Sequence, residues 1–492
     1  MTNSNNAQHR SILQNIARRA MFDRGLLPDF PQQAINELDK IKVAAIQPDG
    51  QARDLRGLVW CSIDNDDSRD LDQLTVAEAM ENGVVKVLVA IADVDSMVKK
   101  NSAIDDHARH NTCSVYTAAQ IFPMLPEKLS NDLTSLNFGS DRRAIVIEMV
   151  FADDGTLTGS DLYQGIVRNQ AKLAYNAVAG WLEQGGPKPP EIAAVDGLAE
   201  NIRLQDRTAQ KLKTLRHVNG ALEFETLETH PVFDGNVLKG LETERTNRAK
   251  SIIEDFMIAA NGVTARFLAS KQAPSIRRVV RTPKRWDRIV ELAAQHNFTL
   301  SKGPDPKALE EFLTKAKAAD PDRFPDLSLS VIKLLGPGEY VVELPGSAVS
   351  GHFGLAVRDY THSTAPNRRF PDIITQRLLK AAIAGKSSLY STDELEALAK
   401  HCTEMEDKVK KVERQVEKSA AAMLLEPRIG EQFDAFVTGA SEKGTWVRIT
   451  NPPVEGKLMN GAKGLDVGVR LRVQLVSTNV EQGFIDFAKE NF

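Results

Sequence analysis

The chain has 492 residues, of which 42% are hydrophobic and 26% are charged, and it includes 22 prolines and 31 glycines. This composition is that of a globular protein, and the length predicts about three units of roughly 150 residues each. The formal net charge of −4 excludes a simple polybasic nucleic-acid binder, although a local basic groove is compatible with it.

The cysteines and the N-terminal segment bear on the compartment. Cys61, Cys113 and Cys402 are too widely spaced for a disulfide framework or a zinc motif, which favours a reducing cytoplasm. The segment MTNSNNAQHR has no apolar stretch, and no run of about 18 apolar residues follows it. We therefore expect a cytoplasmic protein with neither export nor a membrane span.

Residues 1–50 form the first predicted unit. Between residues 11 and 40, short helical segments are broken at Gly25 and at Pro28 and Pro31, and their apolar residues form one small face. We expect a helical head, with a helix-turn-helix-like shape as one interpretation.

The period changes at about residue 55, where RGLVWCSID is a buried strand that leads into SIDNDDSRDLDQ, residues 62–73. The five aspartates of this loop repel one another unless a cation or a basic group neutralises them. A solvated acidic loop and a metal site both explain the cluster. A calcium EF-hand starting at Asp64 does not, because Arg69 stands where glycine is needed and Thr75 where glutamate is needed. Magnesium suits the cluster better, since it prefers hard oxygen ligands and is shared with substrate phosphates.

The rest of the middle region mixes strands and helices. Strand-like segments follow at LTVAEAM, VVKVLVAIADV and RRAIVIEMVF, and helical segments at residues 201–218 and 249–270. We expect residues 51–426 to form one large mixed α/β catalytic domain.

A long helix over residues 391–426 ends this domain. Ser391 and Glu394 have capping-box spacing, and Pro427 stops the helix. A heptad seam runs along it through Leu395, Leu398, Cys402, Met405, Val409, Val412 and Val416. The seam packs either on its own domain or in a dimeric coiled coil. We favour the first, and with it a monomer.

Residues 427–492 form the last predicted unit. Short alternating strands with glycine turns suit a small five-stranded barrel of the OB type. The predicted fold class is therefore multidomain α+β, with a helical head, a mixed α/β domain and a C-terminal barrel.

IDNDDSRDLDQ resembles the I-D-x5-D-x-D-D signature of the ribonuclease II / ribonuclease R (RNB) exoribonuclease family. Further segments are similar to family segments in the same order: IFPMLPEKLSNDLTSL (121–136), ALEFE (221–225), IIEDFMIAANGVTARFL (252–268) and HFGLAVRDYTHSTAPNRRFPDIITQRLL (352–379). The C-terminal barrel resembles an S1 RNA-binding domain. Since residues 1–50 are expected to be helical, we expect them not to form the family's pair of N-terminal cold-shock barrels.

The resemblance implies a 3′→5′ exoribonuclease that hydrolyses single-stranded RNA to nucleoside 5′-monophosphates with Mg²⁺, for which Mn²⁺ can substitute. The partner is then single-stranded RNA and not a membrane. Two alternatives stay open: an RNA-binding protein on a catalytically weakened nuclease scaffold, and an RNA-processing endonuclease.

The resemblance also implies a set of site residues. Asp64, Asp70 and Asp72 fall on acidic metal positions, whereas Gln73 falls where the family has a fourth aspartate. Its neutral amide should weaken cation binding. Asp70 and Asp72 are implied to be catalytic together with Arg368, whose guanidinium can hold phosphate oxygens as charge builds. The Ser and Ile of the family's S-P-I are Ala365 and Asn367 here.

Five residues are implied to contact RNA: Tyr116, Phe224, Glu413, Arg369 and Trp446. Tyr116 would stack on the 3′-terminal base, because every base offers a π-surface. Phe224 and Trp446 are further stacking candidates, with a packed core position as the alternative. Glu413 would lie near the terminal nucleotide or form a helix-surface salt bridge, and Arg369 would assist Arg368. The basic run 275–288 is interpreted as a lining of the RNA path.

Overall fold

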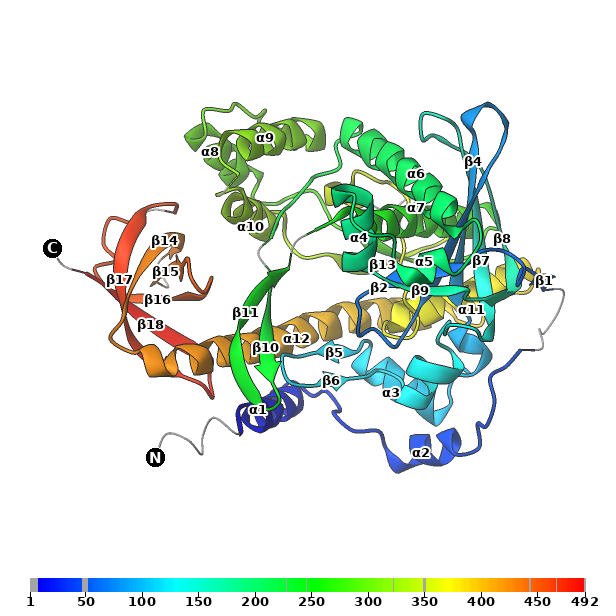
Figure 1. Cartoon of the computed structure of the whole chain (residues 1–492), viewed down its shortest axis with the longest axis horizontal. Coiled ribbons are helices and arrows are strands. Elements are labelled where there is room, and N and C mark those ends of the chain that lie inside the picture. The colour runs from blue at the N-terminus through cyan, green and yellow to red at the C-terminus, as the bar shows by residue number, and fades with distance from the viewer. Residues whose placement is uncertain are drawn as a thin grey trace.

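The structure, a computed structural model, describes residues 8–46, 52–226, 228–244, 246–321, 323–347, 351–441, 444–465 and 467–490. Figure 1 shows a large mixed body and a small barrel joined by the long helix α12 (Thr392–Leu425). The other helices are α1 (His9–Asp23), α2 (Gln32–Leu38), α3 (Ala103–Asn111), α4 (Tyr175–Gln184), α5 (Pro190–Ala193), α6 (Leu198–Val218), α7 (Arg248–Ser270), α8 (Trp286–Gln295), α9 (Pro306–Ala319), α10 (Phe324–Leu335) and α11 (Phe370–Ile383). Short helical turns lie at Glu81–Gly83, Val94–Ser96, Lys128–Leu133, Phe353–Leu355 and Glu426–Arg428.

The body is built on a seven-stranded sheet in the order β1-β8-β7-β4-β3-β2-β9. Its strands are β1 (Arg53–Asp54), β2 (Cys61–Asp64), β3 (Gln73–Ala79), β4 (Val85–Ala92), β7 (Asp141–Phe151), β8 (Leu157–Arg168) and β9 (Ala171–Ala174). Neighbours from β2 through β3, β4 and β7 to β8 are antiparallel, whereas β9 runs parallel to β2 and β1 parallel to β8. The central β4, VKVLVAIA, is apolar on both faces because both faces are covered, and α6 and α7 pack on the sheet.

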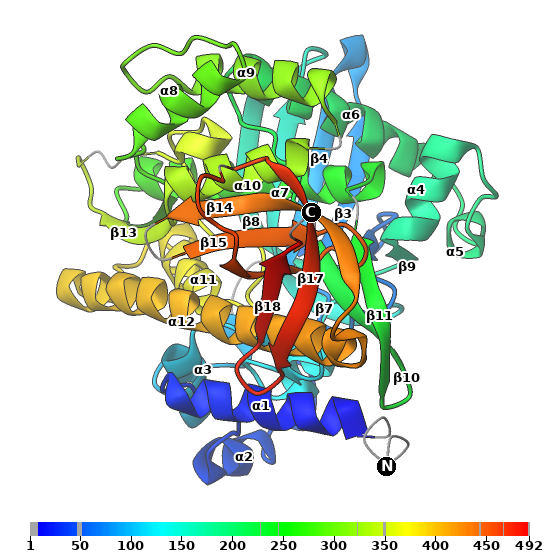
Figure 2. The ribbon, with the colours of Figure 1, turned by 90° about the vertical axis from the view of Figure 1, so that its left-hand side faces the viewer.

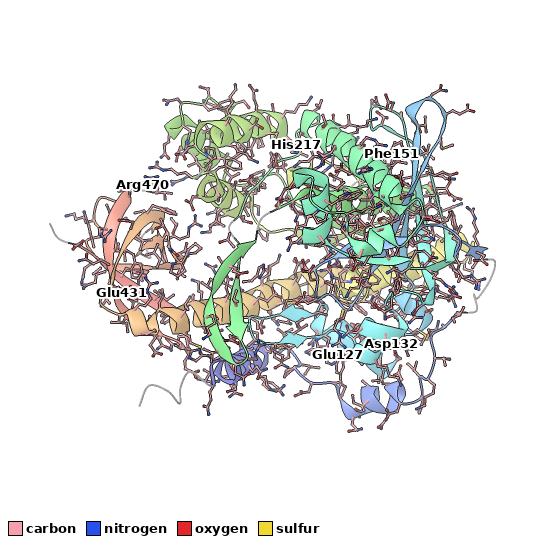
Figure 3. The ribbon with its side chains drawn as sticks, viewed as in Figure 1. Glu127, Asp132, Phe151, His217, Glu431 and Arg470 are labelled. Carbon is pink, nitrogen blue, oxygen red and sulfur yellow. The ribbon has the colours of Figure 1, made fainter. Side chains whose placement is uncertain are left out.

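Three two-stranded units surround the sheet. They are β5 (Val115–Tyr116) with β6 (Ile121–Phe122), β10 (Glu228–Asp234) with β11 (Val237–Glu244), and β12 (Ser275–Val279) with β13 (Glu339–Glu343). Helices α8, α9 and α10 form an insert with its own apolar core around Trp286, Phe312 and Phe324. Figure 3 places His217 at the end of α6, where its Nδ1 lies 3.0 Å from Glu310 Oε1 of α9.

The predicted C-terminal barrel is confirmed. Strands β14 (Gln432–Ser441), β15 (Gly444–Ile449), β16 (Glu455–Asn460), β17 (Arg470–Asn479) and β18 (Phe484–Lys489) close in the order β14-β15-β16-β18-β17. Its core also takes in Ala421, Ala422 and Leu425 of α12, so apolar contacts fix the barrel to the end of that helix. An ion pair between Arg448 of β15 and Asp326 of α10, both largely buried, joins the barrel to the insert.

The seam of α12 packs within the chain, as favoured from the sequence. All seven seam residues are buried, and Ser391 caps the helix by accepting a hydrogen bond from the Glu394 N–H at 3.2 Å. The seam contacts the main core through Leu395 and Leu398 and a second cluster through Val409 and Val412. Turned by 90°, Figure 2 shows α1 beneath α12 on this side.

The head contains the two expected helices. Helix α1 packs on α12 and β11, with Leu13, Ile16 and Ala17 in the same cluster as Val412 and Val416. Helix α2 packs against α3 instead. The helix-turn-helix interpretation and the divisions at residues 50 and 426 stay predictions. Among the described residues, no helix is long and apolar enough to cross a membrane.

The interpretation of the basic run 275–288 is wrong for its first two arginines. Arg277 and Arg278 are 1% and 8% exposed, on β12. Arg277 pairs with Glu343 of β13, and Arg278 makes a two-pronged pair with Glu406 of α12 at 2.8 and 2.9 Å. Arg278 holds α12 to the body and Arg277 joins β12 to β13, so neither lines an open path.

Candidate active site

The aspartate loop closes one edge of the sheet. Because β2 and β3 are antiparallel neighbours, Asp64 at the end of β2 and Asp72 just before β3 meet at that edge. Asp64 Oδ1 accepts hydrogen bonds from the Ser68 hydroxyl at 2.8 Å and from the Asn65 N–H at 2.7 Å. The loop therefore turns back on Asp64, which leaves Asp66 and Asp67 exposed at its tip.

A strap of residues 134–136 holds the other end of the loop. The Ser135 hydroxyl donates to Arg69 O at 2.9 Å and accepts from the Leu71 N–H at 2.9 Å, and the Leu136 N–H donates to Leu71 O at 2.9 Å. At the start of β3, the Ala92 N–H donates to Asp72 O at 3.0 Å. The backbone on both sides of Asp70 and Asp72 is thus fixed.

Asp72 and Arg368 are in contact, and with Asp70, Tyr116 and Glu413 around the aspartate loop they make up the group of side chains that we call the pocket. Arg368 Nε lies 3.3 Å from Asp72 Oδ2, and the Asn367 N–H donates to Asp72 Oδ1 at 2.9 Å. Asp72 is 2% exposed, whereas the Arg368 side chain is 46% exposed. One carboxylate oxygen is therefore fixed by backbone, and the guanidinium beside the other is open to a ligand.

Burial and mutual repulsion act on these carboxylates. Burial chiefly raises the pKa of Asp72 to about 8, with a further push from Asp70, against the opposing pull of Arg368 and of the Asn367 N–H. The pKa of Asp70 is also raised, mainly by burial, and the charge of Asp64 adds to the shift. Burial and repulsion therefore disfavour the charged forms of both carboxylates, and a bound cation would favour them.

Tyr116 and Glu413 stand next to the loop. The Tyr116 hydroxyl donates to Asp70 Oδ2 at 3.1 Å, and the Tyr116 N–H donates to Glu413 Oε1 at 2.9 Å. Tyr116 is 41% exposed, so its ring is not a packed core residue. Glu413 belongs to α12 and receives a backbone hydrogen bond, and burial raises its pKa.

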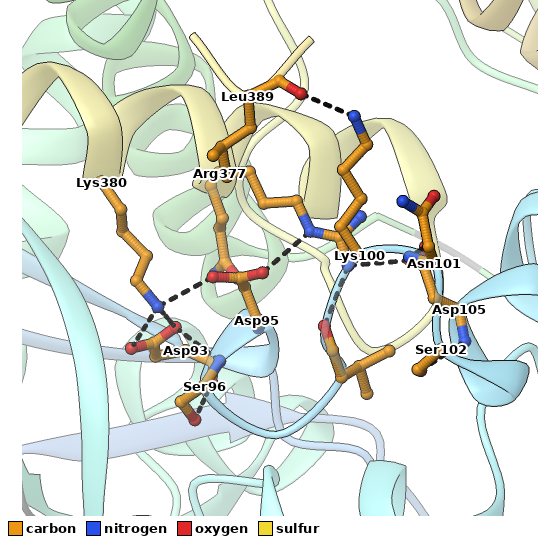
Figure 4. Close-up of polar contacts among 12 residues, drawn as sticks. Asp93, Asp95, Ser96, Lys100, Asn101, Ser102, Asp105, Arg377, Lys380 and Leu389 are labelled. Atoms are coloured by element: carbon orange, nitrogen blue, oxygen red, sulfur yellow. Dashed lines mark hydrogen bonds and ion pairs between the residues drawn. The ribbon is translucent and has the colours of Figure 1, made fainter. Parts of the chain in front are cut away.

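Helix α11 carries the arginine turn at its start and is anchored by buried charges along its length. Arg377 is fully buried and pairs with Asp95 at 2.8 Å and with Asp105 at 2.7 Å (Figure 4). Lys380 pairs with Asp93 at 3.0 Å and with Asp95 at 2.9 Å. These acids follow β4, whose Ala92 bonds to Asp72, so the network sets α11 against the aspartate loop.

Three of the remaining candidates lie apart from this pocket or face away from it. Phe224 is half-buried and packs on the core of the insert, and Trp446 is half-buried on β15 of the barrel. Arg369 turns to Asp372, with Nη2 2.8 Å from Oδ1. Gln73, the first residue of β3, is 8% exposed. The described contacts thus unite Asp70, Asp72, Arg368, Tyr116 and Glu413.

Two residues that the sequence analysis did not identify also border the pocket. Lys172 Nζ donates to Ser68 O at 2.6 Å, beside Asp64. Tyr175 follows β9, and the charges of Asp64 and Arg368 act on its hydroxyl, whose pKa is raised mainly by burial. Since β9 runs parallel to β2, their carboxyl ends meet at one edge, and the segment AKLAY was the signal available.

Known proteins are similar to this chain. The family described as RNB domain matches residues 52–385, and the RNase II-type exonuclease C-terminal S1 domain matches residues 431–490. Ribonuclease R 1 of Lactococcus lactis is 28% identical over 445 residues, which cover 88% of this chain and 53% of that protein. Ribonuclease R of Vibrio cholerae is 30% identical over 418 residues, which cover 82% and 50%. The chain thus spans about half the length of these relatives.

Solved structures show the same fold. Mycoplasma genitalium RNase R in complex with ribose methylated single-stranded RNA matches with a TM-score of 0.87 and 23% identity, covering 97% of this chain and 78% of that one. Yeast Ssd1, described as a pseudonuclease, matches with a TM-score of 0.72 and 16% identity, covering 90% and 55%. With the RNB match spanning most of the body and the S1 match the barrel, the chain belongs to the RNB domain family.

Proposed function

We propose that the chain is a metal-dependent 3′→5′ exoribonuclease that hydrolyses single-stranded RNA to nucleoside 5′-monophosphates. The observation that carries the proposal is the meeting of a fixed, buried carboxylate and a half-exposed guanidinium at Asp72 and Arg368, 3.3 Å apart, in a pocket rich in carboxylates. The relatives named ribonuclease R, and the solved RNase R with single-stranded RNA, support RNA as the substrate.

Each residue of the pocket then has a separate task. Arg368 holds oxygens of the scissile phosphate and stabilises charge as it builds on them. Tyr116 offers an exposed ring on which a terminal base stacks, and its bonds to Asp70 and Glu413 fix the distance between base and phosphate. Because both residues act on one end of a strand, the arrangement favours removal of terminal nucleotides.

The donor set fits a divalent cation, and we propose Mg²⁺ with Mn²⁺ as a substitute. Asp64, Asp70 and Asp72 would hold it, with Gln73 as a neutral oxygen donor. When bound, such an ion polarises the phosphate and lowers the pKa of water. Among the described residues, one group of three or more His, Cys, Asp or Glu side chains has ligand atoms that all lie within 4.8 Å of one another: His217, Glu223 and Glu310. The aspartates of the loop must therefore turn toward one another to share an ion. The His217 group already faces Lys213 and Lys317.

A labelled RNA tests the proposal directly. With a 5′-labelled single strand and Mg²⁺, we expect progressive shortening from the 3′ end, lost with EDTA and with Asp72→Asn. Asp66→Asn is the matched control, because Asp66 belongs to the same loop but is exposed at its tip. Asp72→Asn should still bind RNA. Discrete internal fragments would instead indicate an endonuclease, and an active Asp72→Asn variant would remove Asp72 from the site.

The second candidate is an RNA-binding protein on a weakened nuclease scaffold. Gln73 favours it, because one carboxylate of the family signature is missing, and the fold is shared with yeast Ssd1, described as a pseudonuclease. RNA binding without shortening, in both Mg²⁺ and Mn²⁺, would establish this alternative.

We further propose that RNA reaches the pocket by way of the S1-type barrel, with Trp446 and Phe224 as stacking residues outside the pocket.

The three unpaired thiols, at Cys61, Cys113 and Cys402, support a cytoplasmic location. The self-contained seam of α12 supports a monomer.

A further inference from the structure

Asn367 touches two of the segments that shape the pocket. Its backbone N–H donates to Asp72 Oδ1 at 2.9 Å, and its side chain lies 2.6 Å from the Thr134 hydroxyl. Thr134 begins the strap that holds the aspartate loop. Asn367 is 0% exposed, so bulk water does not compete for the hydrogen bonds of its amide.

The hydrogen count at Thr134 leaves one end of the amide unpaired. The Thr134 Oγ1 lies 2.8 Å from Leu129 O and 2.6 Å from the Asn367 amide, but a hydroxyl has one hydrogen to give. With the Asn367 oxygen as the acceptor, the amide nitrogen has no partner among the described residues.

An unpaired polar end in a buried place does not favour folding. An apolar residue, such as the isoleucine of the family pattern, would avoid it and lose only the contact with Thr134. The fold alone therefore gives no reason for an amide here, which points to a role in the pocket.

We propose that Asn367 is a positioning residue for Asp72, an inference that rests on the proposed function. The amide, anchored on Thr134, fixes the turn of residues 365–368, so that the Asn367 N–H stays on Asp72 Oδ1. Asp72 then presents Oδ2 toward Arg368 and a divalent cation. The anchor matters in this chain because Gln73 contributes no charge, and three carboxylates must hold the ion.

The test measures Mn²⁺ binding by electron paramagnetic resonance, without RNA. Asn367→Ile and Thr134→Val should each weaken Mn²⁺ about tenfold, as is usual when a residue supporting a metal ligand is lost. The double variant should be no weaker than either single one, because both remove the same contact. Thr208→Val is the control. Its buried hydroxyl donates to Leu204 O within α6, and it should leave Mn²⁺ affinity within about twofold.

Turnover provides a second measurement. Asn367→Ile should lower kcat about tenfold and leave KM for RNA within about twofold, with the thermal unfolding midpoint unmoved. If Asn367→Ile does not fold, Thr134→Val reports on the same contact with Asn367 in place.

The outcomes separate this inference from the proposed function. A chain without nuclease activity whose Mn²⁺ affinity falls in both single variants supports the positioning role and overturns the proposed function. Unchanged Mn²⁺ affinity in Asn367→Ile, additive losses in the double variant, or no Mn²⁺ binding by the unaltered chain overturns the positioning role.

Discussion

Replacing Arg377 by methionine should destabilise the body by about 4 kcal/mol, since breaking a buried ion pair costs about 3–5 kcal/mol. The guanidinium is fully buried and donates to Asp95, to Asp105, to Val98 O at 2.9 Å and to the Tyr390 hydroxyl at 2.9 Å. Asp95 would keep Lys380 as a partner, whereas Asp105 would keep only the Asn101 N–H at 2.8 Å. The larger part of the loss therefore comes from Asp105.

Urea denaturation of the intact chain measures the loss, and Lys100→Met is the matched control in the same network (Figure 4). Lys100 pairs with Glu394 at 2.9 Å, but the two side chains are 21% and 36% exposed. Such a pair contributes about 0–1 kcal/mol. Adding Asp105→Asn to Arg377→Met should recover part of the loss, because it removes the uncompensated charge. Equal losses for Arg377→Met and Lys100→Met would refute the reasoning.

Three further changes test other parts of the chain. Gln73→Asp should lower the Mg²⁺ needed for half-maximal hydrolysis about tenfold, because it restores a charged ligand, and an unchanged requirement would place Gln73 away from the ion. The hydrogen bond to Glu310 raises the pKa of His217, so its stabilisation is full below the unfolded pKa of about 6.5 and is lost as pH rises through the folded pKa. Glu310→Gln should flatten that part of the stability–pH curve, and a curve of unchanged shape would contradict the assignment. Leu13→Ala should cost about 2–5 kcal/mol in urea denaturation, because Leu13 is buried against α12, whereas a loss below about 1 kcal/mol would mean that α1 is loosely held.

Local patterns predicted those elements whose partners lie close in the sequence. Strand β2, the hairpin of β3 and β4, and the heptad seam of α12 each bury residues that a short local pattern shows, although the strand predicted for RGLVWCSID begins only at Cys61. The capping of α12 by Ser391 also needed only residues three apart. These predictions agree with the structure because they depend on contacts within one element or between adjacent ones.

The basic run failed for the opposite reason. Arg277 and Arg278 look like part of a solvated cationic segment, because their partners lie 66 and 128 residues further along the chain. No local pattern shows that Glu343 and Glu406 will pack beside them. A charge run therefore indicates an open surface only where no distant acid packs against it.

The pocket divides in the same way. Asp64 and Asp72 could be placed together because they belong to one short loop and match the metal positions of the family signature. Tyr175 could not, because the parallel pairing of β9 with β2 joins segments about 110 residues apart. Asn367 was visible only as a departure from a pattern, and its contact with Asp72 spans 295 residues.

Helix α12 connects the C-terminal barrel to the pocket. Ala421 and Leu425 belong to the barrel core, Glu413 holds the Tyr116 N–H, and Glu406 holds Arg278 of the body. Since these contacts lie on one continuous helix of 34 residues, a rotation of the barrel with α12 would move Glu413 and with it Tyr116. Tyr116 in turn bonds to Asp70, so the orientation of the barrel and the geometry of the aspartate loop are coupled through two side chains.

Glu413→Gln keeps the shape of this link and weakens its hydrogen bond. This variant therefore tests whether an RNA held by the barrel affects the geometry of the pocket. The substitution should lower the rate of hydrolysis more for RNA with a single-stranded tail long enough to reach the barrel than for a short oligonucleotide. Equal losses would show that the barrel only tethers the substrate.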